Sequence, residues 1–378
     1  MEQAGSSPQR FHNQERLLKR PECIPTGLPQ IHHDYDILGY RDGLFQVLGW
    51  ALSPRETWTK AVAYLNGSEL GHSTAKTRLD VAAALPHFPQ AEQSQFFFSS
   101  AEQGIGLGET DRLDIVFYAG DKPLAAVWTP VRTDLEERMP IPPAHLMQRV
   151  IGTQRADAFL RFALTCMGQY LAAIRRWRHL DGSCRLLDWG CGCGRVTAHY
   201  LLLQQGPTVL GCDIDAEDIE WCVANLPGAS FQATPPFPPL PYESGSMDVV
   251  VSLSVLTHLT KKQQMDWLKE IDRVLAPGGV FVASVLGPWG ADRHPDRYLA
   301  DRIAKEDFFD DLHDPALDGI APAGYYRATY QRESYTRATF GRFFDVMEYI
   351  EGGVGIQDLV VGKKKARAGG VRGWLRGR

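Results

Sequence analysis

The segment Leu186-Leu187-Asp188-Trp189-Gly190-Cys191-Gly192-Cys193-Gly194-Arg195 decides how this chain folds. An apolar strand ends in the acid Asp188, and Gly190, Gly192 and Gly194 then occupy every second position. Glycine has no Cβ and tolerates positive φ, so this loop can turn tightly and let a ligand lie against the backbone. A helix expected from about Gly194 would direct its N-terminal amides to the same place. The segment therefore indicates a nucleotide-like ligand.

A second acid follows the next strand. Asp213 ends the run Val209-Leu210-Gly211-Cys212 and lies 23 residues after Gly190. A carboxylate at this position can accept hydrogen bonds from both hydroxyls of a ribose. Strand, loop and helix alternate from about residue 181, which predicts an α/β fold with a Rossmann-like, doubly wound, mostly parallel sheet. A nicotinamide dinucleotide and S-adenosylmethionine both fit this frame.

Three features favour S-adenosylmethionine. The dinucleotide fingerprint GxGxxG lacks its third glycine, which would fall at Arg195 or Thr197. The acid before the loop suits an ammonium group but would repel a pyrophosphate. Residues 342–364 hold two strand-like runs separated by Gly352-Gly353, and a terminal antiparallel hairpin is not needed by a plain dinucleotide-binding sheet. An NAD(P)-dependent oxidoreductase and a non-catalytic binding protein that retains the fold stay as alternatives.

The chain before residue 363 divides into four segments, and residues 363–378 form a fifth, the basic tail. Residues 1–33 are polar without an apolar period and predict a mobile arm. Residues 34–133 contain runs in which apolar and polar residues alternate, as in strands, and Asn66-Gly67 marks a type I′ hairpin between two of them. This pattern predicts a small antiparallel β-sandwich. Residues 134–180 form a linker and a helix whose apolar stripe packs on the next domain, and residues 181–362 form the α/β domain. Thr260 and Gln263 are spaced as a capping box for a later helix.

The charge is distributed unevenly. The formal net charge is −5, but residues 363–378 contain seven Lys or Arg and no acid, which leaves 33 basic and 45 acidic residues before them. That acidic body makes nucleic-acid binding unexpected, whereas the basic tail could contact an anionic membrane surface. The seven cysteines form no CxxC pair, so we expect reduced thiols, no metal site, and Cys191 and Cys193 as small space-fillers. The first thirty residues lack the apolar core of a signal peptide, and a cytoplasmic location is the default.

Four segments resemble the successive motifs of class I S-adenosylmethionine-dependent methyltransferases. They are LLDWGCGCGR (186–195), GCDIDAEDIEWC (211–222), PLPYESGSMDVVVSLSVLTHL (239–259) and IDRVLAPGGVFVAS (271–284). The chain is similar in particular to bacterial members with an N-terminal β-domain that are associated with polysaccharide or glycan biosynthesis. The resemblance implies that Asp188, Trp189 and the three glycines line the methionyl and ribose portions and that Asp213 takes the ribose hydroxyls. It also places Ser252 and Ser254 near the donor methyl.

The resemblance has one departure, at the adenine. Many relatives carry an acid after the third strand, whereas this chain reads Phe231-Gln232-Ala233-Thr234 followed by prolines. Adenine recognition is therefore expected to rest on backbone and apolar contacts, with Ile214 as one wall.

A carbohydrate or another small polar molecule is the expected acceptor of the methyl group. The long segment 289–335 follows a strand at the ligand edge and is expected to bind it. His258 is the candidate general base for a hydroxyl acceptor because the ordinary histidine pKa suits proton removal at neutral pH. The candidate acceptor residues combine flat rings with hydrogen-bonding groups: His294, Tyr325, Tyr326, Arg327 and Tyr330.

Overall fold

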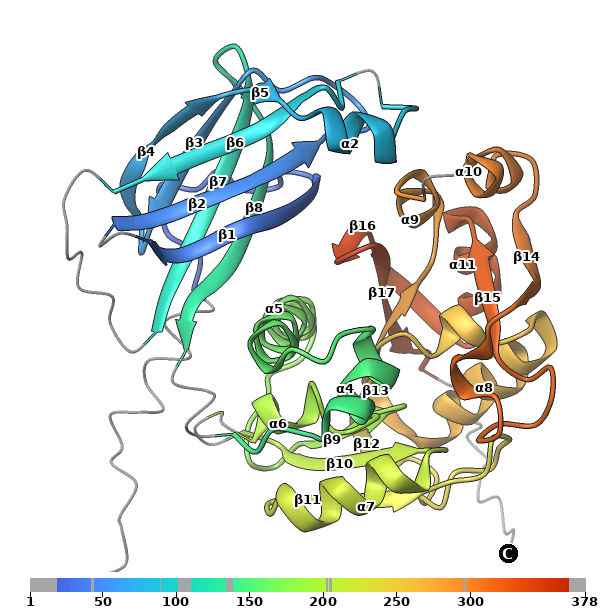
Figure 1. Ribbon diagram of the computed structural model, residues 1–378. Coiled ribbons are helices and arrows are strands. Elements are labelled where there is room, and N and C mark those ends of the chain that lie inside the picture. The colour runs from blue at the N-terminus through green and yellow to red at the C-terminus, as the bar shows by residue number, and fades with distance from the viewer. Residues whose placement is uncertain are drawn as a thin grey trace, which may run out of the picture.

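The structure is a computed structural model that describes residues 19–41, 44–88, 90–100, 110–133, 139–201, 203, 206–294 and 297–366. An N-terminal pair of β-sheets lies above a C-terminal α/β domain, and two helices connect them (Figure 1). Within this part of the chain, none of the helices combines the length and apolar character needed to cross a bilayer.

The N-terminal domain is a sandwich of two four-stranded sheets with the orders β1-β2-β6-β5 and β4-β3-β7-β8. The side chains of Phe45, Trp58, Phe96 and Phe117 are buried between them. The strands are β1 (His32–Arg41), β2 (Leu44–Leu52), β3 (Lys60–Leu65), β4 (Ser68–Thr74), β5 (Lys76–Thr77), β6 (Gln93–Ser99), β7 (Thr110–Ala119) and β8 (Lys122–Thr133), with helix α2 (Leu79–Ala84) before β6.

The turn between β3 and β4 confirms the predicted hairpin. Asn66 and Gly67 have φ angles of 53° and 86°, as a type I′ turn requires at both central positions. The strand pair is in register around them, with Leu65 opposite Ser68.

Part of the segment that was expected to be a mobile N-terminal arm is packed in the structure. Its residues 1–18 lie outside the described residues, but residues 19–33 are described, and Ile24 and Ile31 there are 3% and 2% exposed. Strand β1 already begins at His32. Ile31 belongs to the core of the sandwich. Such an isolated apolar residue gives no periodic pattern that the sequence could show.

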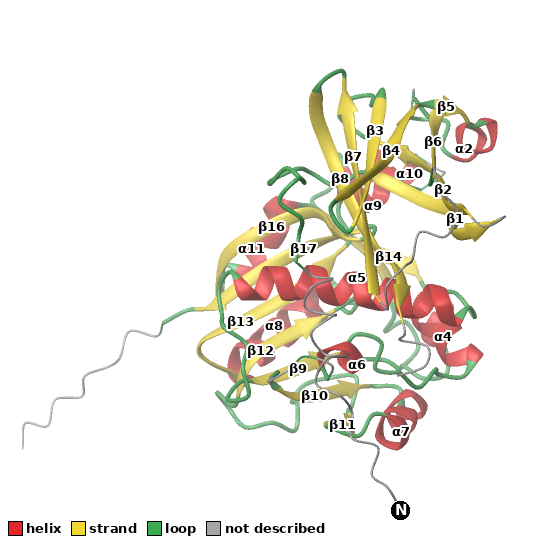
Figure 2. Cartoon of the chain, turned by 90° about the vertical axis from the view of Figure 1, so that its left-hand side faces the viewer, coloured by secondary structure: helices red, strands yellow, loops and turns green. Residues whose placement is uncertain are grey.

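Two helices, α4 (Ala144–Ile151) and α5 (Ala156–Arg175), follow the sandwich. The predicted stripe on α5 is buried, since Phe159, Cys166 and Tyr170 belong to the core that α5 forms with the C-terminal sheet. Figure 2 shows α5 as a long helix lying across that sheet. Phe162 was expected in the same stripe, but it is 38% exposed and is not part of this core.

The C-terminal domain has a seven-stranded sheet with the order β11-β10-β9-β12-β13-β17-β16. Strands β9 to β13 pair in parallel, and β17 is antiparallel to both of its neighbours. This confirms the doubly wound sheet and its closing hairpin. The bounds are β9 (Arg185–Trp189), β10 (Thr208–Asp213), β11 (Ala229–Ala233), β12 (Met247–Ser252), β13 (Leu275–Val285), β16 (Phe344–Val354) and β17 (Gln357–Lys364).

The hairpin turns later than expected. Strand β16 continues through Gly352 and Gly353, and the turn falls at Gly355 and Ile356. Gly352 donates its backbone N–H to Asp358 Oδ1 at 2.8 Å, which holds the double glycine inside the strand pair. Strand β17 extends to Lys364, so the basic tail starts two residues later than predicted, and residues 367–378 of it lie outside the described residues.

Three helices connect the parallel strands: α6 (Thr197–Tyr200), α7 (Ala216–Asn225) and α8 (Lys261–Val274). Helix α8 has the predicted capping box, in which the Thr260 and Gln263 side chains each bond the other's backbone amide. Helix α6 begins three residues later than expected, because Gly194 is in the left-handed region with φ 73° and the turns that follow continue to Val196.

The segment after β13 folds into a small subdomain with its own apolar core of Leu299, Ile303, Phe309 and Tyr330. Sequence patterns predicted only a long binding loop there. Its elements are α9 (Pro288–Asp292), α10 (Tyr298–Ile303), β14 (Phe308–His313), η2 (Pro315–Leu317), β15 (Arg327–Gln331) and α11 (Glu333–Phe340). A short helix outside it, η1 (Leu256–His258), precedes α8.

The sandwich is docked on this subdomain and on the terminal hairpin. The buried ring of His32 stacks on Trp289 with a centroid distance of 3.9 Å. The Arg293 guanidinium lies 5.2 Å from the ring centre of Trp50, and Arg55 pairs with Glu351 of β16. The accessory domain thus contacts the segment expected to bind the acceptor.

Candidate functional site

The glycine loop after β9 is tied to both neighbouring strands. The backbone amides of Gly190 and Cys191 donate to the Cys212 carbonyl of β10 at 2.8 and 3.1 Å. Gly190 has φ 77°, and a Cβ at this position would lie 2.1 Å from Cγ2 of Val255, which follows β12. Only glycine fits there, so the loop is constrained by its own protein neighbours as well as by any ligand.

A cavity opens beside this loop at the carboxyl ends of β9, β10 and β12. Residues that the sequence did not single out supply much of its wall, among them Arg149, Asp215, Asp218, Val255 and Leu317. The predicted residues that line it are Asp188, Trp189, Gly190, Gly192, Asp213, Ile214, Ser254, His258, Tyr325 and Tyr326.

Two predicted cofactor residues do not line the cavity. The position of a Cβ on Gly194 would be 2.4 Å from Cδ1 of Leu226, so this glycine permits close packing on α7. Ser252 is buried within β12, and its carbonyl accepts a hydrogen bond from the Tyr170 hydroxyl at 2.7 Å. Both residues therefore support the site from behind.

Three predicted acceptor residues also lie elsewhere. Tyr330 is buried in the subdomain core, where its ring stacks on Phe309 at 5.2 Å. His294 is exposed beyond α9 and is not part of the cavity wall. The backbone carbonyl of Arg327 lies beside His258 Nδ1. Its side chain turns back to its own loop, where Nε donates to the Gly324 carbonyl at 2.9 Å.

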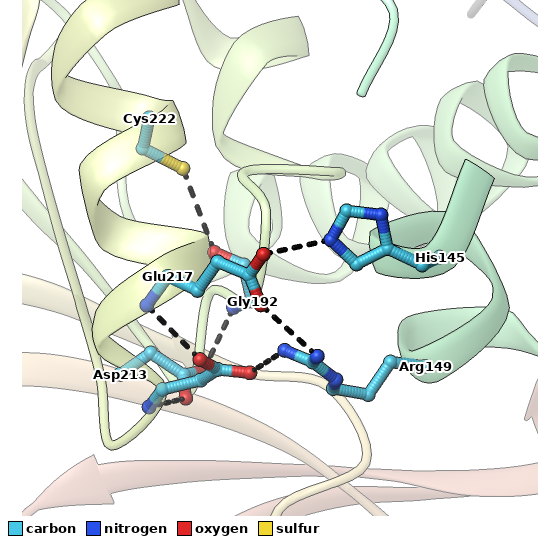
Figure 3. Close-up of polar contacts among 7 residues, drawn as sticks. His145, Arg149, Gly192, Asp213, Glu217 and Cys222 are labelled. Carbon is cyan, nitrogen blue, oxygen red and sulfur yellow. Dashed lines mark hydrogen bonds and ion pairs between the residues drawn. The ribbon is translucent and has the colours of Figure 1, made fainter. Parts of the chain in front are cut away.

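Asp213 joins the glycine loop to the end of β10 (Figure 3). Its Oδ2 accepts from the Gly192 amide at 2.8 Å, and its Oδ1 accepts from the Asp215 amide at 3.0 Å. Burial raises the pKa of Asp213. Each carboxylate oxygen has two lone pairs, so both oxygens can accept a further hydrogen bond from a diol.

Asp188 is a deeply buried acid of the cavity. Its Oδ2 accepts a hydrogen bond from Thr197 Oγ1 at 2.6 Å, and only 2% of the residue is exposed. Burial raises its pKa to about 6. A cationic ligand group placed against this carboxylate would lower that pKa again and would be bound more tightly for it.

A second layer of acids was missed by sequence reasoning. Asp215 caps α7 by accepting from the Glu217 amide at 3.1 Å and pairs with Arg149 of α4. Arg149 and His145 also hold Glu217, at 3.1 and 2.7 Å (Figure 3). Burial raises the pKa of Asp218 to about 8. The acid-rich stretch 213–218 was visible in the sequence, but the partner helix α4 was not.

His258 lies across the cavity from the glycine loop, in η1. Its Nδ1 is 3.0 Å from the Arg327 carbonyl and 3.5 Å from Asp314 Oδ2. A carbonyl can only accept, so Nδ1 carries the hydrogen and Nε2 has the free lone pair. Burial lowers the pKa of His258 to about 4. The ring is therefore neutral at physiological pH and is a weaker base than its ordinary pKa suggested.

Two tyrosines of the subdomain complete this wall. The Tyr326 ring stacks on His258 with a centroid distance of 3.9 Å and an interplanar angle of 11°. The Tyr325 hydroxyl donates to the Pro236 carbonyl and accepts from Trp267 Nε1 at 3.4 Å. The proline-rich loop after β11 is thereby attached to the subdomain, and Phe237 packs edge-on against Tyr325 at 5.3 Å.

The charges of the cavity decide between the two candidate ligands. Four aspartates line it, Asp188, Asp213, Asp215 and Asp218, against the cations Arg149 and Arg195. Asp218, whose pKa burial raises to about 8, is largely uncharged at neutral pH, so the other three carry the negative charge. S-adenosylmethionine carries a sulfonium and an ammonium against one carboxylate and suits such a lining. The pyrophosphate of a nicotinamide dinucleotide would face these acids unfavourably. The residues present thus fit S-adenosylmethionine.

Comparison with known proteins agrees with this geometry. Residues 187–283, which run from β9 through the glycine loop to β13, match the family described as a methyltransferase domain. Over residues 187–283 the chain therefore contains a methyltransferase domain. S-adenosylmethionine is accordingly its cofactor.

Individual relatives match the methyltransferase domain over short stretches. An uncharacterised methyltransferase of Synechocystis is 32% identical over 97 residues, which cover 26% of this chain and 44% of that protein. A probable tRNA methyltransferase 9B of Bos taurus is 31% identical over 110 residues, covering 29% and 23%. The chain thus spans less than half the length of these curated relatives. A solved methyltransferase structure from Methanosarcina mazei is similar with a TM-score of 0.40 and 22% identity, covering 52% of this chain and 98% of that one.

Proposed function

We propose that this protein transfers a methyl group from S-adenosylmethionine to an oxygen or nitrogen of a carbohydrate or another small polar acceptor. The observation that carries the proposal is the neutral His258 ring on the cavity wall, with its hydrogen on Nδ1 and with Tyr326 stacked on it. This wall lies opposite the acids that suit the cofactor.

The cofactor roles follow from the positions of the acids. Asp213 would accept hydrogen bonds from the ribose hydroxyls, since both of its oxygens keep a lone pair. Asp188 would hold the ammonium group of the methionyl moiety. Trp189 and Ile214, with Thr234 at the end of β11, would enclose the adenine by apolar and backbone contacts.

The acceptor would be positioned by the subdomain side of the cavity. S-adenosylmethionine, when bound, supplies an electrophilic methyl group. His258 Nε2 can take the hydrogen of an acceptor hydroxyl, and Asp314 beside Nδ1 would stabilise the imidazolium that results. Burial keeps the pKa of Tyr326 well above its usual range, so its hydroxyl stays a hydrogen-bond donor. Alignment of acceptor and methyl would supply most of the rate enhancement.

The net negative charge of residues 1–362 disfavours a nucleic-acid acceptor. One relative is named as a probable tRNA methyltransferase, but RNA binding depends on Lys and Arg contacts to phosphates. Residues 1–362 have 33 basic and 45 acidic residues. A small molecule or glycan is therefore the proposed partner. Contact of the basic tail with an anionic membrane surface, and a cytoplasmic location, stay predictions from the sequence.

The test is methyl transfer from radiolabelled S-adenosylmethionine to fractionated glycans and small polar metabolites. His258→Gln is expected to lower kcat by about 10²-fold or more and to leave the KM for S-adenosylmethionine unchanged. The neutral ring is the active form, so the wild-type kcat at saturating S-adenosylmethionine should fall only as the pH drops towards 4, and the variant should lose that fall.

The control is His179→Gln, an exposed histidine outside the cavity. Transfer to no fraction by the wild type would refute the proposed activity. Equal kcat values for the wild type and His258→Gln would refute the role of the histidine alone.

A further inference from the structure

A second and larger cavity, of about 810 Å³, lies between the sandwich and the methyltransferase domain. Its volume is within the range of small-molecule sites. Strands β1 and β8 form one side, the start of α5 forms another, and the turn between β16 and β17 closes the third. Residues that represent these three sides are Tyr35, Trp128, Arg161, Phe162 and Ile356.

The apolar part of this wall is open. Phe162 and Ile356 are 38% and 42% exposed, which is unusual for large apolar side chains at an internal junction. The Phe162 ring lies against the turn, since a Cβ on Gly355 would be 3.4 Å from it. Flat rings and an aliphatic side chain thus face the cavity where a ligand could cover them.

The polar part of the wall contains hydrogen-bonding atoms without protein partners. Among the described residues, Tyr35 Oη and Gln169 Oε1 are buried and make no hydrogen bond. Such atoms normally have a partner, and a ligand hydroxyl could supply it after a small side-chain adjustment.

The charges of the wall are balanced. Asp157 accepts from both Arg155 and Arg161, at 2.7 and 2.8 Å. Arg293 lies 3.8 Å from Asp34. The remaining acid, Asp36, is paired with Arg78 at 2.6 Å. Because these arginines are already opposed by acids, the cavity offers no excess charge for a phosphate or a nucleic acid.

This cavity shares walls with the donor cavity. Val150 lines the donor cavity and the next residue, Ile151, lines the interdomain cavity. The guanidinium of Arg195, in the donor wall, lies 5.1 Å from the ring centre of Phe162. Gln357, next to Ile356, donates to Ser254 Oγ in the donor wall. A ligand held between the domains would therefore lie close to the donor site.

We propose that the interdomain cavity binds a neutral, hydroxyl-rich ligand, namely an oligosaccharide segment. Sugar rings present CH faces to flat apolar side chains and hydroxyls to polar groups, as this mixed and uncharged wall requires. The binding claim stands on the cavity alone. The further claim that the bound segment belongs to the acceptor rests on the proposed function.

The experiment titrates the full chain with maltohexaose, cellohexaose and chitohexaose, followed by ligand-observed NMR. Polyuridylate is the anionic comparison. At least one neutral oligosaccharide is expected to bind, and more tightly than polyuridylate. Ile356→Trp, which fills the cavity from an exposed turn, should weaken that binding at least tenfold. Tyr35→Phe removes only the unpartnered hydroxyl and should weaken it about three- to tenfold without lowering the melting temperature.

The control is Leu79→Ala, which changes an exposed apolar residue of α2 outside the cavity. All variants should bind S-adenosylhomocysteine like the wild type, which shows that the donor site is intact. Absence of binding for all three oligosaccharides, tighter binding of polyuridylate, or unchanged binding by Ile356→Trp would each overturn the proposal. The methyl-transfer assay tests the proposed function separately, so the binding claim and the proposed function can be refuted independently of each other.

Discussion

Replacement of Asp213 by Asn tests the acid that joins the glycine loop to β10. Asp213 accepts one backbone hydrogen bond on each carboxylate oxygen, from Gly192 and from Asp215. An Asn side chain has one acceptor oxygen, so at most one of these bonds survives and an amide hydrogen faces the other N–H. The variant loses both the charge and half of the local hydrogen bonding.

The magnitude follows from these contacts. Leaving one buried N–H unpaired costs roughly 1–3 kcal/mol of stability. Burial raises the pKa of Asp213, so the wild type already bears a cost of ionisation that the Asn variant avoids, and the net loss should fall at the low end. Ligand affinity should fall further, because a hydrogen bond to a charged group contributes about 1.5–3 kcal/mol, or roughly 10- to 150-fold.

Calorimetric titration with S-adenosylhomocysteine measures the affinity, and thermal unfolding measures the stability. Asp345→Asn, an exposed acid of β16, is the matched control and should leave both unchanged. An Asp213→Asn affinity within threefold of the wild type would refute the assignment of this carboxylate to the ribose hydroxyls.

Three further predictions concern the same cavity. Gly190→Ala should destabilise the fold by at least roughly 1–3 kcal/mol in urea unfolding, because φ is positive and the new Cβ meets Val255; a stability equal to the wild type would contradict the steric argument. Burial raises the pKa of Asp188 to about 6, so S-adenosylhomocysteine should bind more weakly as the pH falls through 6. The variant Asp188→Asn should remove that pH dependence of the affinity. The same raised pKa makes the unliganded protein less stable as the pH rises from about 4 to 6. Arg149→Met should lower the affinity for S-adenosylhomocysteine about threefold to tenfold in the same titration, because α4 loses its ion pair with Asp215; unchanged affinity would mean that α4 does not shape the site.

Local signals in the sequence were sufficient for most of the fold. The Thr260 and Gln263 capping box and the Asn66-Gly67 turn depend only on neighbours within a few residues, and both are present. The parallel pairing of the central strands followed from alternation along the chain, whereas their order in the sheet was not predicted. The residue at which α6 begins could not be predicted, because it depends on how the left-handed Gly194 packs against Leu226 of a later segment.

Residues of the candidate site were predicted correctly where only their own strand decides their position, and not where contacts with distant segments do. The acids Asp188 and Asp213 follow directly from their strands, and both line the cavity. The state of His258 depends on Asp314 and the Arg327 carbonyl, which lie far along the chain in a subdomain whose fold had no periodic pattern. Tyr330 was expected to bind the acceptor because it combines a flat ring with a hydrogen-bonding hydroxyl, but on strand β15 it lies in the subdomain core.

The stacking of His32 on Trp289 has a consequence for how this protein could diversify. One partner belongs to the sandwich and the other to the subdomain that carries the tyrosines of the acceptor wall. A lineage that exchanged its accessory domain would leave the Trp289 ring without its cover and would loosen α9. Recombination at residues 134–143 is therefore expected to succeed only when the two surfaces are exchanged together, so that acceptor preference and accessory domain are inherited as one unit.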